Sequence, residues 1–205
     1  MLQPRSIQSS LSIRDKLLSL DLILVISILV LGIVSMFAMY STDGGEFKYH
    51  TNSHILRFFV FFGMFFIVSF ISIRFWHETS YLIYIGIFIL LLGVKYFGLT
   101  SSGSKRWLDL YFINLQPSEL MKIALILFLS KYYHRISIES INSFRYLILP
   151  ITVLVAPLIL VATQPDLGTS ILIAAGGVIV AWLAGVRPKF FVISGFAMIA
   201  LLPIA

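Results

Sequence analysis

The sequence predicts an all-α fold, a polytopic bundle of membrane helices. Of the 205 residues 59% are hydrophobic and only 12% are charged, and long apolar runs recur along the chain. An ordinary soluble domain has roughly 25% charged residues, so this chain has too few polar residues to cover a surface in water. The mean hydropathy of +0.99 agrees. This composition excludes a disordered protein and an ordinary soluble enzyme, and the absence of cysteine excludes disulfides and thiolate metal sites.

Six runs of 16 to 21 residues lack Asp, Glu, Lys, Arg and His, and a further segment has a helical pattern but carries charges. A membrane helix needs roughly 20 apolar residues, and aromatic or polar flanks extend the shorter runs. We expect about seven transmembrane helices, in chain order Leu22–Thr42, Phe58–Ile73, Thr79–Val94, Pro117–Tyr133, Tyr146–Pro165, Leu167–Val186 and Phe190–Ala205.

Residues 1–20 are expected to form a cytoplasmic tail, and residues 21–205 the transmembrane bundle. The first run is too long for the apolar region of a signal peptide, and no A-x-A motif follows it, so we predict a permanent span. With the N-terminus in the cytoplasm, nine of the fifteen Lys and Arg residues fall on the cytoplasmic side and five outside, with Lys122 inside the fourth span. Topology thus accounts for the net charge of +6, and we expect no nucleic-acid partner. The long external loop is 95–116.

The fourth predicted span is polar at its first end. Glu119 and Lys122 lie three residues apart, on one helix face, and can form an ion pair. In one interpretation the pair lines a polar cavity inside the bundle, because ionisable residues at membrane depth are functional candidates. In the other, Pro117 begins the helix, Glu119 complements the helix dipole, and Lys122 extends toward the headgroups.

The fifth and sixth predicted spans form a tight antiparallel hairpin. Asp166 lies between them, where it can cap the sixth span by accepting from the backbone N–H of Gly168 or Thr169. An anion at this depth needs a partner, and Lys122 or Arg106 would supply one where the loops converge. The sixth span also predicts close helix packing, through small residues at four-residue spacing: Gly177, Ala181 and Gly185.

Two loop segments have side chains suited to binding. Lys105 and Arg106 stand beside Trp107, where they would either bind a lipid diphosphate or form an interfacial belt of cations and an aromatic ring. In the first external loop Glu46, His50 and His54 are spaced four apart, so a helix would align them. The alternatives there are a metal site, which such spacing permits, and a solvated loop, which we favour because the segment is short and polar.

Three short motifs follow one another along the chain: G-S-K-R-W-L-D-L at 103–110, Q-P-S-E-L-M-K at 116–122 and Q-P-D-L-G-T-S at 164–170. Their order and spacing resemble those of the SEDS family, the shape, elongation, division and sporulation proteins. The resemblance runs from about residue 21 to the end of the chain. The residues of the first and third motifs are more similar to the rod-elongation branch than to the division branch. Asn114 departs from the pattern, because many relatives have a basic residue there.

The resemblance implies a ten-helix, multi-pass protein of the bacterial inner membrane. It implies a glycosyltransferase that polymerises lipid II, the undecaprenyl-diphosphate-linked disaccharide-pentapeptide, beside a class B penicillin-binding protein. By motif position, Glu119 and Lys122 match a polar pair lining the family's central cavity. Asp166 matches the acid of the third motif, and Arg106 the basic residue beside the Trp. The family's catalytic Asp lies in an external loop that we expect beyond Ala205, so we assign no catalytic residue here.

The implied reaction is attack of a sugar 4-hydroxyl on the anomeric carbon of a lipid-linked donor, with undecaprenyl diphosphate leaving. It needs a base for the hydroxyl, and cations or a divalent metal for the diphosphate. Lys105, Arg106 or Lys122 would supply the cations, and we assign no cofactor or metal to this chain. Two alternatives stay open: a lipid II flippase or other transporter, which also needs a polar cavity, and a non-catalytic scaffold that docks a partner's helix.

Overall fold

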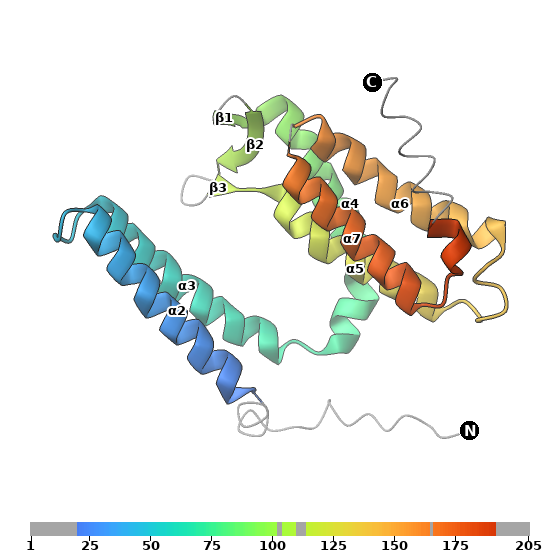
Figure 1. The fold of residues 1–205 in the computed structure, drawn as a ribbon, viewed down its shortest axis with the longest axis horizontal. Helices are drawn as coiled ribbons and strands as arrows, with labels where there is room; N and C mark the ends of the chain where they lie inside the picture. Colours follow the sequence, from blue (N-terminus) through green and yellow to red (C-terminus); the bar gives the residue numbers. More distant parts are fainter. Residues whose placement is uncertain (1–19, 102–103, 110–113, 165, 192–205) are drawn as a thin grey trace. The chain divides into compact units, whose positions relative to one another are not determined.

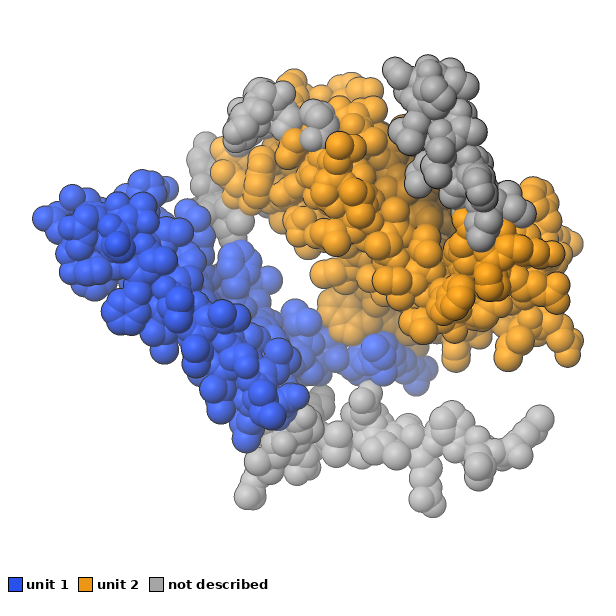
Figure 2. Space-filling model, viewed as in Figure 1, with its two compact units in different colours: residues 1–75 blue, residues 76–205 orange. Residues whose placement is uncertain are grey.

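The computed structural model describes residues 20–101, 104–109, 114–164 and 166–191, and its elements are shown in Figure 1. The helices are α2 (Leu22–Thr42), α3 (Tyr49–Phe70), α4 (Ile73–Phe97), α5 (Pro117–His134), α6 (Phe144–Ala162) and α7 (Leu167–Leu183). The strands are β1 (Leu99–Ser101), β2 (Ser104–Asp109) and β3 (Asn114–Leu115). The chain divides into two compact units, residues 1–75 and 76–205, coloured separately in Figure 2.

The helices confirm a polytopic, all-α membrane protein. Among the described residues, α2, α3, α4 and α6 are each long and apolar enough to cross a bilayer, while α7 is apolar and 17 residues long. Each of the first six predicted spans corresponds to one helix. Of the seventh, only the first residues are described: the chain is helical over 188–191, and 192–205 lie outside the described residues.

The first unit contains the antiparallel pair α2 and α3. Asp21 caps α2, because its Oδ1 accepts from the backbone N–H of Ile23 at 2.9 Å and of Leu24 at 3.3 Å. Gly32 is buried on α2, and the ring of Phe58 on α3 occupies the space that a Cβ would take. The missing side chain thus lets the two helices approach closely.

The turn between α2 and α3 is held by a buried carboxylate. Asp43 accepts hydrogen bonds from the Thr51 hydroxyl at 2.6 Å and the Thr51 backbone N–H at 2.7 Å, and His50 Nδ1 lies 3.2 Å from it. The bonds from Thr51, the side-chain bond above all, lower the pKa of Asp43 from its usual value. Gly44 and Gly45 complete the turn, both with a φ of +80°, which glycine adopts without strain.

The start of α3 corrects the sequence analysis. The predicted second span began at Phe58, with a solvated loop over 43–57, but α3 begins at Tyr49. The prediction of the loop was wrong because polarity was used to end the span. Polar residues continue a helix readily when its first turn is capped, as Asp43 caps this one through the N–H of Thr51.

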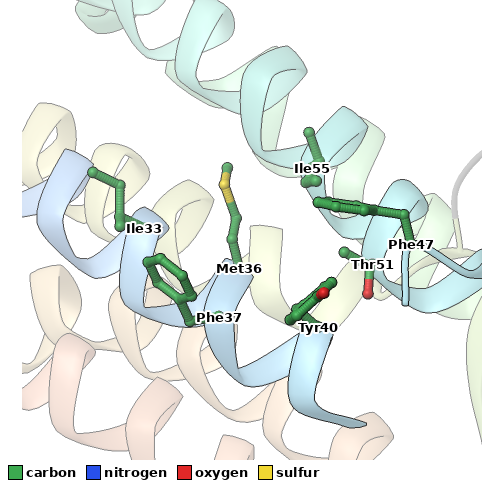
Figure 3. A pocket seen from close by; sticks show the side chains of 7 residues that line it. All are labelled: Ile33, Met36, Phe37, Tyr40, Phe47, Thr51 and Ile55. Atoms are coloured by element: carbon green, nitrogen blue, oxygen red, sulfur yellow. The ribbon is translucent and has the colours of Figure 1, made fainter. Parts of the chain in front are cut away.

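A pocket of about 420 Å³ lies within the first unit (Figure 3). Its lining is almost wholly apolar and aromatic: Ile33, Met36, Phe37, Tyr40, Phe47, Thr51 and Ile55. The hydroxyl of Thr51 already donates to Asp43. The pocket therefore presents hydrocarbon surface, and the candidate site residues are not among those that line it.

The second unit is built around α5, which packs against α6 and α7. Its buried face consists largely of aliphatic and aromatic side chains, including Met121, Ala124, Leu125, Phe128 and Leu129. Two polar contacts join other parts of this unit, one between helices and one between the connections that flank α6 and α7. The Tyr84 hydroxyl on α4 donates to the Val153 carbonyl on α6 at 2.7 Å, and the Arg187 backbone N–H donates to Asn142 Oδ1 at 2.8 Å.

The small residues of α7 have two different roles. Gly177 is buried, and a Cβ there would lie 2.6 Å from Leu154 Cδ1 on α6, so its predicted role in close packing is confirmed. For Gly185 the prediction was wrong, because the helix has ended before it. Gly185 has a φ of +97°, and the N–H of Val186 donates to the Ala181 carbonyl at 3.1 Å, which is the six-to-one bond of a Schellman C-cap.

The segment between α4 and α5 forms a small antiparallel sheet, in the order β1-β2-β3. Leu99 pairs with Trp107, Leu108 pairs with Leu115, and the register shifts after Leu99. The sequence analysis predicted only a long loop here. The sheet gives β2 a fixed position next to α5 and thereby positions the side chain of Arg106.

Candidate functional site

Asp166 lies at the N-terminus of α7, where it has two structural bonds. Its Oδ1 accepts from the backbone N–H of Thr169 at 3.1 Å, which confirms the predicted N-cap. The Ser170 hydroxyl donates to the Asp166 backbone carbonyl at 2.8 Å. The side chain is 12% exposed. The cap uses one carboxylate oxygen, which leaves Oδ2 available to side chains from other elements.

Arg106, on β2, reaches the same place. Its Nε donates to the Gln164 carbonyl at 3.0 Å, and its terminal nitrogen lies 3.9 Å from Asp166 Oδ2. The guanidinium thus binds the end of the α6–α7 connection as well as the carboxylate. The side chain is 31% exposed, so part of the cation faces outward. Of the two partners that the sequence analysis considered for Asp166, the structure has Arg106.

Gln116 is the third member of this group, and the sequence analysis missed its contact. Its Nε2 donates to Asp166 Oδ2 at 3.2 Å from the residue immediately before α5. Its place as the first residue of the second motif was the available signal. Gln116, Arg106, Gln164 and Asp166, which we call the Asp166 cluster, therefore join all three motifs at one end of the second unit.

Glu119 and Lys122 form the predicted ion pair on α5. Lys122 Nζ lies 2.9 Å from both carboxylate oxygens of Glu119. The Glu119 side chain is 53% exposed and that of Lys122 23%. Pro117 occupies the first turn of α5 and Glu119 follows it, as the structural interpretation expected. A place for this pair on a central cavity stays a prediction.

Lys105 and Trp107 alternate with Arg106 along β2, so they lie on the other face of the strand. Lys105 is exposed, and Trp107 is half-buried. The structure therefore brings Arg106, but not its two neighbours, into the Asp166 cluster. Their contact with a lipid diphosphate stays a prediction.

Ser118 was not singled out from the sequence, although it is the third residue of the second motif. Its side chain is buried, with 1% of the residue exposed, and its hydroxyl has no hydrogen-bond partner among the described residues. A buried hydroxyl without a partner lowers stability, since it has lost its bonds to water. Its unpaired state is an exception to the rule that buried polar groups are hydrogen-bonded.

Glu46, His50 and His54, for which a metal site was the alternative not favoured from the sequence, do not gather around one point. His50 and His54 do share the helix α3, but their nitrogens have other neighbours: His54 Nε2 lies 2.9 Å from Ser35 Oγ, and His50 contacts Asp43. Glu46 pairs with Lys48 at 3.0 Å. No group of three or more His, Asp or Glu side chains that could hold a metal occurs within the described part of the chain.

Comparison with known proteins identifies the family of this chain. Residues 15–205 match the cell cycle protein family of FtsW, RodA and SpoVE. The chain is 34% identical over 158 residues to the probable peptidoglycan glycosyltransferase FtsW of Buchnera aphidicola subsp. Schizaphis graminum, covering 74% of this chain and 45% of that protein. It is 38% identical over 122 residues to the peptidoglycan glycosyltransferase MrdB of Escherichia coli, covering 60% and 32%.

Solved structures share the fold. The rod shape determining protein RodA of Thermus thermophilus, in a mutant form, matches with a TM-score of 0.74 and 23% identity over 90% of this chain and 60% of that one. A chain of a peptidoglycan synthase complex that coordinates polymerization and crosslinking matches with a TM-score of 0.68 and 25% identity, covering 92% and 55%. The matches thus span about a third to three fifths of these relatives. The chain belongs to the FtsW, RodA and SpoVE family, the SEDS family that its three motifs predicted.

Proposed function

We propose that the chain is part of a peptidoglycan glycosyltransferase that polymerises lipid II during cell elongation, as a RodA-like protein. The observation that carries the proposal is the Asp166 cluster, in which the three motifs meet although they lie up to 58 residues apart. Relatives named as peptidoglycan glycosyltransferases support the reaction class. The residue sequence R-W-L-D-L in the first motif supports a role in cell elongation over a role in cell division.

The Arg106 guanidinium would neutralise the charge that develops on the leaving diphosphate. Nε is held by the Gln164 carbonyl, and the terminal nitrogen is aligned by Asp166, so the side chain is oriented before a substrate arrives. Arginine suits this role because its planar fork binds phosphate oxygens bidentately. Lys105 and Lys122 are further candidate cations, and no residue of this chain is proposed as the base.

We assign no divalent metal to this chain; in the full-length protein such an ion would help to neutralise the leaving diphosphate. Within the described residues, acidic and histidine side chains do not gather in a group of three that would hold such an ion. The Asp166 carboxylate is instead occupied by an N–H, an amide and a guanidinium. The proposal therefore derives no step through a metal.

We also propose a cellular location, a partner protein and a substrate. It takes the bacterial inner membrane as the location, with the N-terminus in the cytoplasm, because Lys and Arg are more frequent on that side. It takes a class B penicillin-binding protein as the partner, and the likeness to a chain of a peptidoglycan synthase complex supports this. Lipid II is the proposed substrate.

The test is polymerisation of purified lipid II by the full-length protein with its penicillin-binding partner. We expect glycan strands from the parent protein and a loss of about tenfold or more for Arg106→Ala, since removing one preorganised donor costs on the order of 10²-fold in other enzymes. Lys48→Ala is the matched control, because it removes an exposed cation paired with Glu46 in the first unit. Unchanged polymerisation by Arg106→Ala would contradict the proposed role of Arg106. Translocation of lipid II by the parent protein without polymerisation would contradict the proposed glycosyltransferase function.

A further inference from the structure

A second polar group lies at the other end of the second unit, where α4 begins and α5 ends. Lys131 is buried there, with 6% of the residue exposed. Its Nζ donates to the Glu78 backbone carbonyl at 2.7 Å and lies 4.4 Å from the centre of the Tyr81 ring. Both contacts are favourable, but the backbone carbonyl and the aromatic ring that Lys131 meets carry no formal charge. Within the described part of the chain, the buried ammonium therefore has no carboxylate at ion-pair distance to neutralise it.

Arg135 adds another cation to the same aromatic ring. Its guanidinium carbon lies 5.9 Å from the centre of the Tyr81 ring, and its side chain is exposed. Two cations near one aromatic ring repel each other, and the ring compensates this repulsion only in part. One of these cations, Lys131, is buried and the other, Arg135, is exposed, and an anion bound near both would stabilise both.

Two histidines extend the group. His134 is exposed on the last turn of α5, and its ring packs edge-on against His77 of α4, with the centroids 5.6 Å apart and the planes at 84°. His77 Nε2 is buried and has no hydrogen-bond partner in the described part of the chain. An unpartnered nitrogen in a ring that packs against His134 is a second sign that a polar ligand belongs at this place.

We propose that Lys131, His134 and Arg135 bind the phosphodiester of an anionic membrane phospholipid. The group lies where α4 begins, and because α4 is long and apolar enough to cross a bilayer, we expect this end of the helix at the level of the headgroups. Basic pockets between membrane helices are suited to anionic headgroups. Ammonium and guanidinium groups donate charge-assisted hydrogen bonds to phosphate oxygens, and this chemistry is independent of the proposed glycosyltransferase site.

The experiment compares phospholipid binding by the full-length protein in detergent, counted by native mass spectrometry. We expect phosphatidylglycerol to bind roughly tenfold more tightly than phosphatidylcholine, since each Lys or Arg near a membrane surface adds about a factor of five for anionic lipid. Arg135→Gln should weaken phosphatidylglycerol binding by about fivefold and leave phosphatidylcholine binding unchanged. Lys95→Gln is the control, because it removes an exposed cation from the last turn of α4, at the opposite end of the helix that carries Tyr81.

Three results would overturn the proposal. They are equal binding of the two lipids, equal effects of Arg135→Gln and Lys95→Gln, and displacement of phosphatidylglycerol by inorganic phosphate at the same concentration. The last would assign the site to free phosphate. The comparison of lipids needs no variant, and His134→Gln is a second exposed substitution with the same expected direction, so the test holds even where Arg135→Gln does not fold.

Discussion

Asp166→Ala tests whether the Asp166 cluster holds the second unit together. The substitution removes three interactions whose geometry is known: the cap bond from Thr169 at 3.1 Å, the bond from Gln116 at 3.2 Å and the ion pair with Arg106 at 3.9 Å. An N-cap contributes about 1 kcal/mol, and a hydrogen bond to a charged group about 1.5 kcal/mol. The ion pair adds only a few tenths of a kcal/mol, because Arg106 is partly exposed.

The sum is about 2 to 3 kcal/mol of lost stability. In a domain of this size each kcal/mol lowers the melting temperature by about 2 to 4 °C, so we expect a decrease of about 4 to 12 °C. All three tryptophans of the chain lie in the second unit, so tryptophan fluorescence during heating in detergent reports on the unit that contains Asp166.

Gln116→Leu and the double variant complete a double-mutant cycle. We expect Gln116→Leu to be destabilising and its effect to be largely absent when Asp166 is already alanine, because the bond it removes no longer exists. A decrease below about 1 °C for Asp166→Ala would refute the reasoning. Strictly additive effects of the two substitutions would show that the bond between them contributes nothing.

Three more predictions concern other elements. Gly177→Ala should destabilise the second unit by about 1 to 3 kcal/mol, because a Cβ there would lie 2.6 Å from a methyl carbon of Leu154 on α6. Gly176→Ala is the control and should be neutral in the same fluorescence melt, because its Cβ would have an ordinary 3.6 Å contact with Ile126. Ser118→Ala should leave the melting temperature unchanged or raise it, since it removes a buried hydroxyl without a described partner. Because the pKa of Asp43 is lowered, its contribution to stability is complete above about pH 4 and is lost as the pH falls through the lowered pKa. In Thr51→Val, which lacks the hydroxyl that donates to Asp43, carboxyl NMR titration should show the pKa of Asp43 rise toward 3.8.

The sequence predicted the helices well because membrane spans obey a simple rule. A run such as Leu22–Thr42 must satisfy its own backbone hydrogen bonds in lipid, so apolarity alone identifies the helix, and α2 has those bounds. The rule fails at the ends. Nothing in lipid partitioning specifies that Tyr49 begins α3, because the start depends on the capping of Thr51 by Asp43, eight residues earlier.

The candidate site was predictable residue by residue but not as a unit. Arg106, Glu119, Lys122 and Asp166 were all identified from local patterns and motifs. Those patterns predicted the cap on Thr169 and the Glu119–Lys122 pair, which are both local in sequence. Bonds between distant segments required the sheet, and its strands are too short for alternating hydrophobicity to reveal them.

The position of the Asp166 cluster follows from the order of the helices. The connection from α4 to α5 and the connection from α6 to α7 lie at the same end of the second unit, which is why Gln116 meets Asp166. At a helix end, a carboxylate such as Asp166 can be stabilised by free backbone N–H groups, whereas in mid-membrane it would need another charge. The cluster can therefore keep a partly exposed cation, Arg106, oriented at this end of the helices. Substitutions within the cluster should then affect the orientation of Arg106 even where they do not touch it.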